Sequence, residues 1–348
     1  MTDPVIVSPK VLREFARNIL TALKLPPSSA ELVAASLVSA DLRGVDSHGV
    51  HLLPHYVKQL EKGNLDPNAE GHVISESGVC LLYDGENGIG HLIAKTCCGH
   101  AVRLAKGNGV GIAISRRSNH FGAAAFWAQQ ISSNGMIGIV FSNASPAVPP
   151  WQGREGRFGT NPFCVSVPSS GEGGWLLDMA TTRVALNKIV KAADQQDDIP
   201  AGWALDSQGV PTTDIDEALR GLLMPLGEYK GSGLAMMIEI LCAVLSGGVM
   251  STEVGGLHIL ERPMNISQFF LAIDVARFLP LPEFQQRMEH LVKTVKSARP
   301  AEGYDEVLVA GEPEWDSEAR LLREGIPVAA GVWKRLVEIA NTYEVTVP

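Results

Sequence analysis

The sequence predicts an α+β protein in which helices flank a mixed sheet. Three observations support this: helical periodicity over residues 8–63, β-rich runs alternating with helices from Val73 onward, and a hairpin in the middle of the chain. At 348 residues the chain is long enough for about two domains of ~150 residues.

The N-terminal helices are predicted from caps and apolar spacing. Ser8 and Pro9 begin the first helix. A capping box, Ser28-x-x-Glu31, begins a second helix that ends at Gly44. A third is expected at 49–62, with Pro54 in its first turns.

Strands and helices then alternate. Strands are expected at 79–83, 109–115 and 136–142, and the helices between them at 92–105 and 121–132. The runs 163–167 and 175–178 are joined by a short loop, so they predict an antiparallel hairpin and hence a mixed sheet. A strand at 268–274, a helix at 282–298, a strand at 307–309 and two closing helices complete the prediction.

Composition argues against several classes of protein. The 38 acidic and 29 basic residues give a net charge of -9, which disfavours binding to nucleic acid. Five cysteines without a Cys-x-x-Cys pair fit neither a disulfide framework nor a zinc ribbon, and indicate a cytoplasmic protein. The apolar segment 234–250 carries Glu239, which favours a buried helix over a membrane span. Met1 to Lys10 lacks the pattern of a signal peptide.

Dinucleotide-binding glycine motifs are missing. The glycines of 107–111 have the wrong spacing for Gly-x-Gly-x-x-Gly and precede a strand, and the sequence has no Gly-Lys pair for a P-loop. The sequence therefore disfavours a Rossmann crossover, and a bound nucleotide would need other phosphate donors.

Histidines concentrate in the segment 46–56. His48, His51 and His55 share one helical face and resemble a metal site, but Pro54 interrupts that helix and no carboxylate is spaced to join them. A metal-dependent lyase or hydrolase using these three histidines is therefore an alternative only.

Two histidines are candidates for proton transfer. His48 lies at a helix entrance, and the adjacent Gly49 would let a substrate approach the imidazole. His120 follows a strand, where α/β sheets bind ligands. For each, a capping role is the alternative.

Two further segments carry charge. Asp178 at a strand end could orient a catalytic imidazole or cap a helix. Lys230 stands at the positive end of a long helix and suits a phosphate or a carboxylate.

Five segments in this order resemble the malate/L-lactate dehydrogenase family, which is unrelated to the Rossmann-type enzymes of those names. They are Asp46-Ser47-His48-Gly49-Val50, Ser118-Asn119-His120-Phe121-Gly122, Gly159-Thr160-Asn161-Pro162, Asp178-Met179-Ala180-Thr181-Thr182 and Tyr229-Lys230-Gly231-Ser232-Gly233. The family includes dehydrogenases of ureidoglycolate and sulfolactate, a diketogulonate reductase and a cyclic imino-carboxylate reductase.

The resemblance implies a homodimeric NAD- or NADP-dependent oxidoreductase with a non-Rossmann, largely antiparallel sheet. Residues 1–72 and about 282–348 would form a helical domain from both chain ends, and 73–281 the cofactor- and substrate-binding domain. The enzyme would move hydride between the nicotinamide and C2 of a small 2-hydroxy or 2-oxo acid. Reduction of a cyclic imino carboxylate is the alternative, and a non-catalytic ligand sensor is a third.

The resemblance also assigns residues. His48 is favoured as the proton-transfer residue, with His120 as its rival and Asp178 as an orienting group. The cofactor would contact Leu176, Leu177, Asp178, Met179, Ala180, Thr181, Thr182, Tyr229, Lys230, Gly311, Glu312 and Pro313. The substrate would contact Ser47, Tyr56, Asn161 and Lys230, and no metal is expected.

One position departs from the family pattern. Leu52 stands where many members carry an arginine that can grip a substrate carboxylate. Either Arg116, Arg117 or Lys230 takes that role, or the substrate differs from the usual 2-hydroxy acids.

Overall fold

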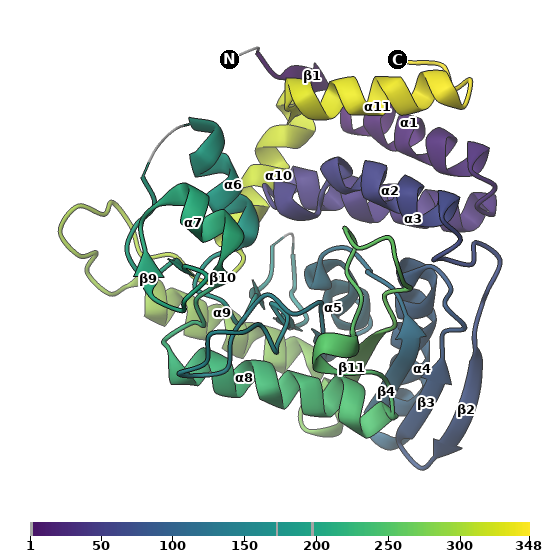
Figure 1. The fold of residues 1–348 in the computed structure, drawn as a ribbon. Coiled ribbons are helices and arrows are strands. Elements are labelled where there is room, and N and C mark those ends of the chain that lie inside the picture. The colour runs from purple at the N-terminus through teal and green to yellow at the C-terminus, as the bar shows by residue number, and fades with distance from the viewer. Residues whose placement is uncertain (1–2, 172, 196–197) are drawn as a thin grey trace.

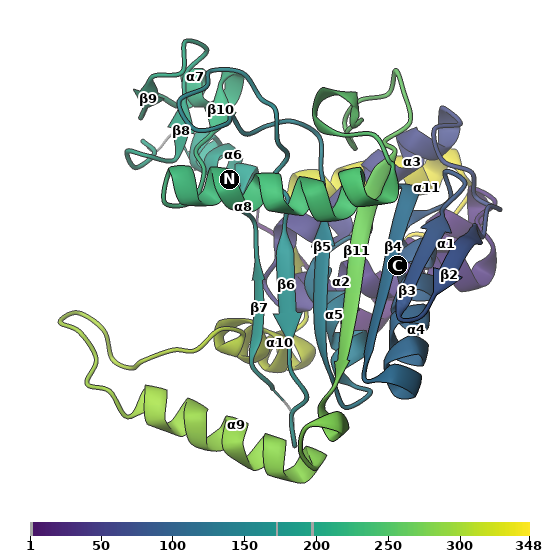
Figure 2. The same cartoon turned by 90° about the horizontal axis from the view of Figure 1, so that it is seen from below.

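The computed structural model describes residues 3–171, 173–195 and 198–348, and a seven-stranded sheet forms its centre (Figures 1 and 2). The strand order is β2-β3-β4-β11-β5-β6-β7. Their bounds are β2 (His72–Ser77), β3 (Cys80–Asp84), β4 (Val110–Ser118), β11 (Ile266–Asp274), β5 (Met136–Ser142), β6 (Phe163–Ser166) and β7 (Leu176–Met179). β3 and β4 pair in parallel and the other neighbours pair antiparallel, which confirms the mixed, largely antiparallel sheet.

Helices cover both faces of this sheet because successive strand residues point to opposite sides. Ala113 and Phe270 pack under α4 (Gly90–Asn108) and α5 (Ala124–Ser132). Ile114 and Phe269 pack against α8 (Tyr229–Glu239) and the π-helical turn η3 (Ile240–Val244). Figure 2 shows α8 crossing the strands on the near side.

The helix predicted to be buried is buried on one side only. Ile238 and Cys242 lie in the core, whereas Met236, Ile240 and Val244 are exposed. The buried-helix expectation is therefore wrong for half of this segment. Among the helices of the described residues, none is long and apolar enough to cross a membrane.

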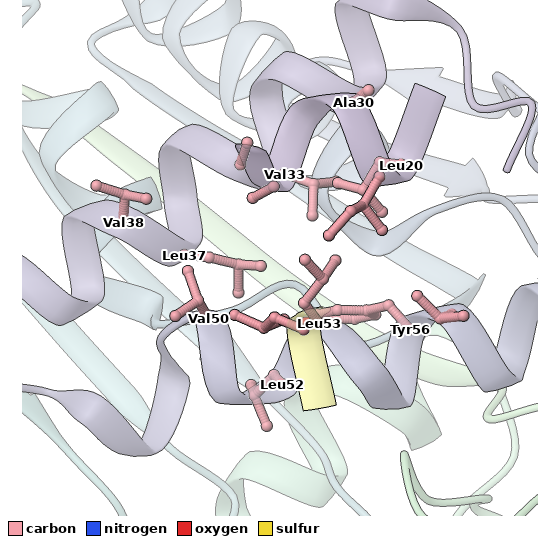
Figure 3. Close-up of a cluster of buried hydrophobic side chains, with 14 of the residues drawn as sticks. Leu20, Ala30, Val33, Leu37, Val38, Val50, Leu52, Leu53 and Tyr56 are labelled. Carbon is pink, nitrogen blue, oxygen red and sulfur yellow. The ribbon is translucent and has the colours of Figure 1, made fainter. Parts of the chain in front are cut away.

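The two chain ends build a helical layer together, as the resemblance implied. β1 (Val5–Val7) pairs antiparallel with β12 (Ile326–Val328). The layer contains α1 (Pro9–Ala22), α2 (Pro27–Leu42), α3 (Leu53–Glu61), α10 (Glu312–Glu324) and α11 (Ala330–Thr342). Its core joins residues of both ends, such as Leu12, Leu37 and Leu336. Figure 3 shows part of this core around Leu53 and Tyr56.

A small third unit was not predicted. α6 (Leu186–Gln195), α7 (Ile215–Arg220) and the short strands β8 (Ala204–Leu205), β9 (Pro211–Thr212) and β10 (Leu222–Leu223) surround their own apolar cluster. α9 (Leu281–Lys296) contacts the loop of the β6–β7 hairpin, where Gln285 donates to the carbonyl of Ser169. Position 172 in that loop lies outside the described residues. The domain boundaries at 72 and 282 stay a prediction.

Three local predictions were wrong. α2 begins at Pro27 without a side-chain cap, so Ser28 forms no capping box. The helix expected from residue 49 begins at Leu53, after the short turns η1 (Asp46–His48) and η2 (Val50–Leu52). Residues 307–309 form no strand, although the next carbonyl, of Ala310, accepts the N–H of Leu176.

Candidate active site

A cavity of about 820 Å³ lies between the N-terminal helices and the sheet. That volume is at the upper end of the range for ligand and cofactor sites. The described residues that line it and carry polar chemistry include Arg43, Ser47, His48, His120, Asp178 and His258.

The turn that carries His48 is fixed from α2. Asp41 accepts the N–H of Val50 at 2.9 Å. A Cβ on Gly49 would overlap the Asp41 carboxylate, so this position requires glycine. The expectation that Gly49 admits a substrate is wrong, because the glycine makes room for Asp41.

His120 is placed by the end of β4. The buried side chain of Asn119 donates to the carbonyl of Gly88, and Gln268 donates to the carbonyl of Asn119. The following helix α5 has Ala123 at its N-cap and no side-chain cap. The alternative in which the polar residues of the segment 118–122 cap the following helix is therefore wrong.

The two candidate histidines lie together in the cavity. Their ring centroids are 5.7 Å apart and the rings are inclined by 17°. The Nδ1 atom of His48 lies 2.9 Å from the Ser47 hydroxyl, and the Nδ1 atom of His120 lies 2.6 Å from the Tyr56 hydroxyl. The sequence alone could not predict this juxtaposition across 72 positions.

These hydrogen bonds distinguish the two imidazoles. Burial raises the pKa of Tyr56, so its phenol keeps its proton and can donate to His120. The N–H of Gly122 also points to His120 Nδ1, at 3.3 Å. A neutral His120 therefore carries its proton on Nε2. The Ser47 hydroxyl can donate or accept, so His48 can adopt either tautomer.

Both rings are neutral near pH 7. Burial lowers the pKa of His48 to about 4, with a smaller contribution from His51. Burial lowers the pKa of His120 well below its ordinary value, and the neighbouring His48 makes a smaller contribution in the same direction. A neutral imidazole can accept a proton from a substrate hydroxyl.

Asp178 does not orient either histidine. Its carboxylate accepts the N–H of Ala125 at 2.9 Å, in the first turn of α5. The side chain is surrounded by protein but open to the cavity, and burial raises its pKa to about 6. Ser47 and Tyr56 take the orienting role that was expected of Asp178.

Part of the expected cofactor segments reaches the cavity. Residues 176–180, Gly311 and Pro313 line it. Thr181 and Thr182 are buried and donate to backbone carbonyls. Glu312 faces away and pairs with Lys296 at 2.6 Å.

The remaining predicted residues lie beside the cavity. Tyr229 and Lys230 are exposed at the start of α8, next to the loop after β7. The fully buried Asn161 donates to the carbonyl of Ala235 and accepts the N–H of Ala144, so its amide positions the surrounding loops. Tyr56 is buried behind His120.

The metal alternative does not fit the geometry. No group of three His, Cys, Asp or Glu side chains within the described ranges could hold a metal ion. His48, His51 and His55 line the cavity but do not converge on one point, and His55 pairs with His258 through their Nδ1 atoms at 3.2 Å.

The residues missed by sequence reasoning are Arg43 and His258, which both line the cavity. The cations that were expected to replace the family arginine lie elsewhere. Arg116 and Arg117 both pair with Asp84, outside the cavity. Arg43 lies just before the turn that carries His48, and this nearness in the sequence could have identified it as a candidate site residue.

The mixed sheet and the histidine pair in a large cavity define a candidate site for proton transfer to and from a bound ligand. The model of the malate/L-lactate dehydrogenase family matches residues 7–337, and the chain belongs to this family of dehydrogenases. It is 37% identical over 338 residues to a malate dehydrogenase of Pyrococcus horikoshii, covering 95% of this chain and 93% of that protein. It is 34% identical to an L-sulfolactate dehydrogenase of Methanocaldococcus jannaschii, covering 97% and 96%.

A solved structure extends the family likeness to another substrate class. The delta1-piperideine-2-carboxylate reductase of Pseudomonas syringae pathovar tomato superposes with a TM-score of 0.84 at 29% identity. The match covers 97% of this chain and all of that one, at 100%. Membership of this dehydrogenase family implies a nicotinamide cofactor.

Proposed function

We propose that this protein is an NAD- or NADP-dependent dehydrogenase that interconverts a small 2-hydroxy acid and its 2-oxo acid. The observation that supports this most directly is the pair of neutral imidazoles in the cavity, one with an adaptable partner and one with a fixed partner. Its relatives are named for malate and sulfolactate, which are both 2-hydroxy acids.

The cavity fits a nicotinamide dinucleotide. Its volume suits a large ligand, and the buried Arg43 guanidinium has no hydrogen-bond partner. Leu176, Leu177 and Gly311 line the cavity and would contact the cofactor. When bound, the nicotinamide would supply a hydride to C2 of the substrate or accept one from it.

We assign proton transfer to His48. In the oxidation direction the substrate hydroxyl gives its proton to His48 Nε2, while Nδ1–H donates to Ser47. His120 presents Nε2–H and donates a hydrogen bond to the same substrate oxygen. Since Tyr56 already donates to His120 Nδ1, neither nitrogen of His120 is free to take the proton.

Replacing each histidine tests this assignment. His48→Asn is expected to lower kcat by about 100- to 10,000-fold while NADH binding stays unchanged. His72→Asn is the matched control, because His72 is an exposed histidine on β2. Turnover of His48→Asn within a few-fold of wild type would move the proton role to His120.

The substrate is tested with a panel. The assay follows oxidation of NADH and NADPH in the presence of pyruvate, oxaloacetate, glyoxylate, sulfopyruvate and cyclic imino acids. Turnover of an imino acid alone would favour the second candidate function, imino-carboxylate reduction, which the reductase superposition supports. Cofactor binding without turnover would favour the sensor.

We also propose a cytoplasmic homodimer. Met236, Ile240, Val244 and Leu245 form an exposed apolar stripe along α8 and η3, of the kind that a second subunit covers. The five cysteines are free thiols, as in a reducing compartment. Sedimentation of the purified protein tests the dimer.

A further inference from the structure

Arg43 is a buried cation whose hydrogen-bonding capacity is unused. It is the C-cap residue of α2 and its side chain is only 4% exposed. None of its three guanidinium nitrogens has a hydrogen-bond partner. A buried charged group that lacks such partners is costly, so this guanidinium needs an explanation.

The contacts of Arg43 hold the side chain but leave its donors open. The guanidinium carbon lies 4.2 Å from the ring centroid of Trp315, and the closest approach to Glu318 is 3.6 Å. Stacking occupies the flat face of the guanidinium, whereas its five N–H groups point outward in the plane. The side chain is therefore oriented before any ligand binds.

Arg43 is also the one arginine or lysine among the lining residues that the structure describes. Both ligands of the proposed reaction are anions, since the cofactor carries a diphosphate and the substrate a carboxylate. Neither Lys230 nor the pair Arg116 and Arg117 lines the cavity.

The position of Arg43 favours the diphosphate. Asp178 on β7 and Glu314 on α10 act electrostatically on the guanidinium, and both line the cavity with Gly311. The two side chains that contact the guanidinium, Trp315 and Glu318, both belong to α10. Arg43 therefore belongs to the β7–α10 side of the cavity, whereas a substrate carboxylate must lie beside the reacting carbon and the histidines.

We propose that Arg43 binds the diphosphate of the nicotinamide dinucleotide and replaces the glycine-rich phosphate loop that this chain lacks. A planar guanidinium can bind two phosphate oxygens at once, as such a site requires. The N-terminus of α10 beside Gly311 adds a positive helix end to the same region. This inference rests on the proposed dehydrogenase function.

Arg43→Met tests the proposal because methionine keeps the packing on Trp315 but removes the charge. Calorimetric titration measures the Kd of NADH, and then the Kd of oxalate, a carboxylate without phosphate, on the NADH-loaded enzyme. The expected result is at least about a tenfold rise in the NADH Kd with the oxalate Kd unchanged. Arg320→Met, at an exposed arginine of the same helix as Trp315, is the matched control.

Arg43→Lys gives a second test, because lysine keeps the positive charge but cannot bind two phosphate oxygens with a planar guanidinium. The NADH Kd is expected to lie between those of wild type and Arg43→Met. Salt should weaken NADH binding by wild type more than by Arg43→Met. An NADH Kd within twofold of wild type, or a loss confined to oxalate, would overturn the inference. If the wild-type protein binds neither NADH nor NADPH, it is the proposed function that fails.

Discussion

Tyr56 is expected to act as a positioning residue for His120, and Tyr56→Phe tests this role. The substitution removes one hydroxyl and keeps the ring that packs in the helical core, where Tyr56 is 1% exposed. His120 Nδ1 then keeps only the weaker contact with the N–H of Gly122, at 3.3 Å. Its proton is no longer confined to Nε2, so part of the enzyme presents the wrong tautomer to the substrate oxygen.

The size of the effect follows from the bond that is lost. Leaving a buried acceptor unsatisfied costs about 1–3 kcal/mol. If that cost falls on the transition state, kcat/KM drops roughly 5- to 150-fold, because each 1.4 kcal/mol is about tenfold in rate. The bond between Tyr56 and His120 is short, at 2.6 Å, which favours the upper part of this range.

The assay compares steady-state kinetics of Tyr56→Phe with those of Tyr83→Phe. Tyr83 is also buried and its hydroxyl donates to the carbonyl of Glu70 at 2.7 Å, and neither residue is among those that line the cavity. Both variants should lose similar stability in urea, but only Tyr56→Phe should lose kcat, with the NADH Kd unchanged. Equal kinetic losses in the two variants, or a Tyr56→Phe rate within twofold of wild type, would refute the reasoning.

Three further predictions concern stability, cofactor binding and substrate choice. Burial lowers the pKa of His91 to about 3, so below pH 6.5 the unfolded chain binds a proton that the folded chain does not. The free energy of unfolding of the wild type therefore falls by about 2 kcal/mol between pH 7 and pH 5 on account of His91. In urea unfolding, the decrease between these two pH values should be smaller by that amount for His91→Leu. Burial raises the pKa of Asp178 to about 6, so the NADH Kd should change around pH 6 in wild type and stay flat in Asp178→Asn, whose side-chain oxygen can still accept from Ala125; a flat wild-type profile would contradict this. Leu52→Arg should lower the KM for 2-oxo acids about tenfold without changing the NADH Kd, because Leu52 lines the cavity, and an unchanged KM would show that another group holds the carboxylate.

Local patterns predicted most of the sheet and the helical layer. β5 was predicted at its observed bounds, and the β6–β7 hairpin followed from its short loop. The unit around β8 and β10 could not be predicted in this way, because two-residue strands carry no alternation. The exposed face of α8 was missed because an apolar composition does not show whether a face meets the core or a partner.

The site was predictable residue by residue only where chemistry lies within one short segment. Ser47 and His48 are neighbours in the chain, so their pairing is local. The stacking of Arg43 on Trp315 joins residues from opposite ends of the chain, and no local pattern reports it. Gly49 shows the reverse case, since a glycine beside a histidine suggests substrate access while its actual cause is the side chain of Asp41.

The two histidines differ in what their partners permit, and a reversible dehydrogenase needs that difference. Oxidation requires an imidazole whose Nε2 can take a proton and reduction requires Nε2 to return it, so Nδ1 must keep its own proton and its partner must accept that N–H. The Ser47 hydroxyl can accept the Nδ1–H in both directions, and His48 need not move. At His120 the backbone N–H of Gly122 can only donate to Nδ1, and the Tyr56 phenol keeps its proton because burial raises its pKa, so His120 Nε2–H offers the substrate oxygen a constant donor in either direction.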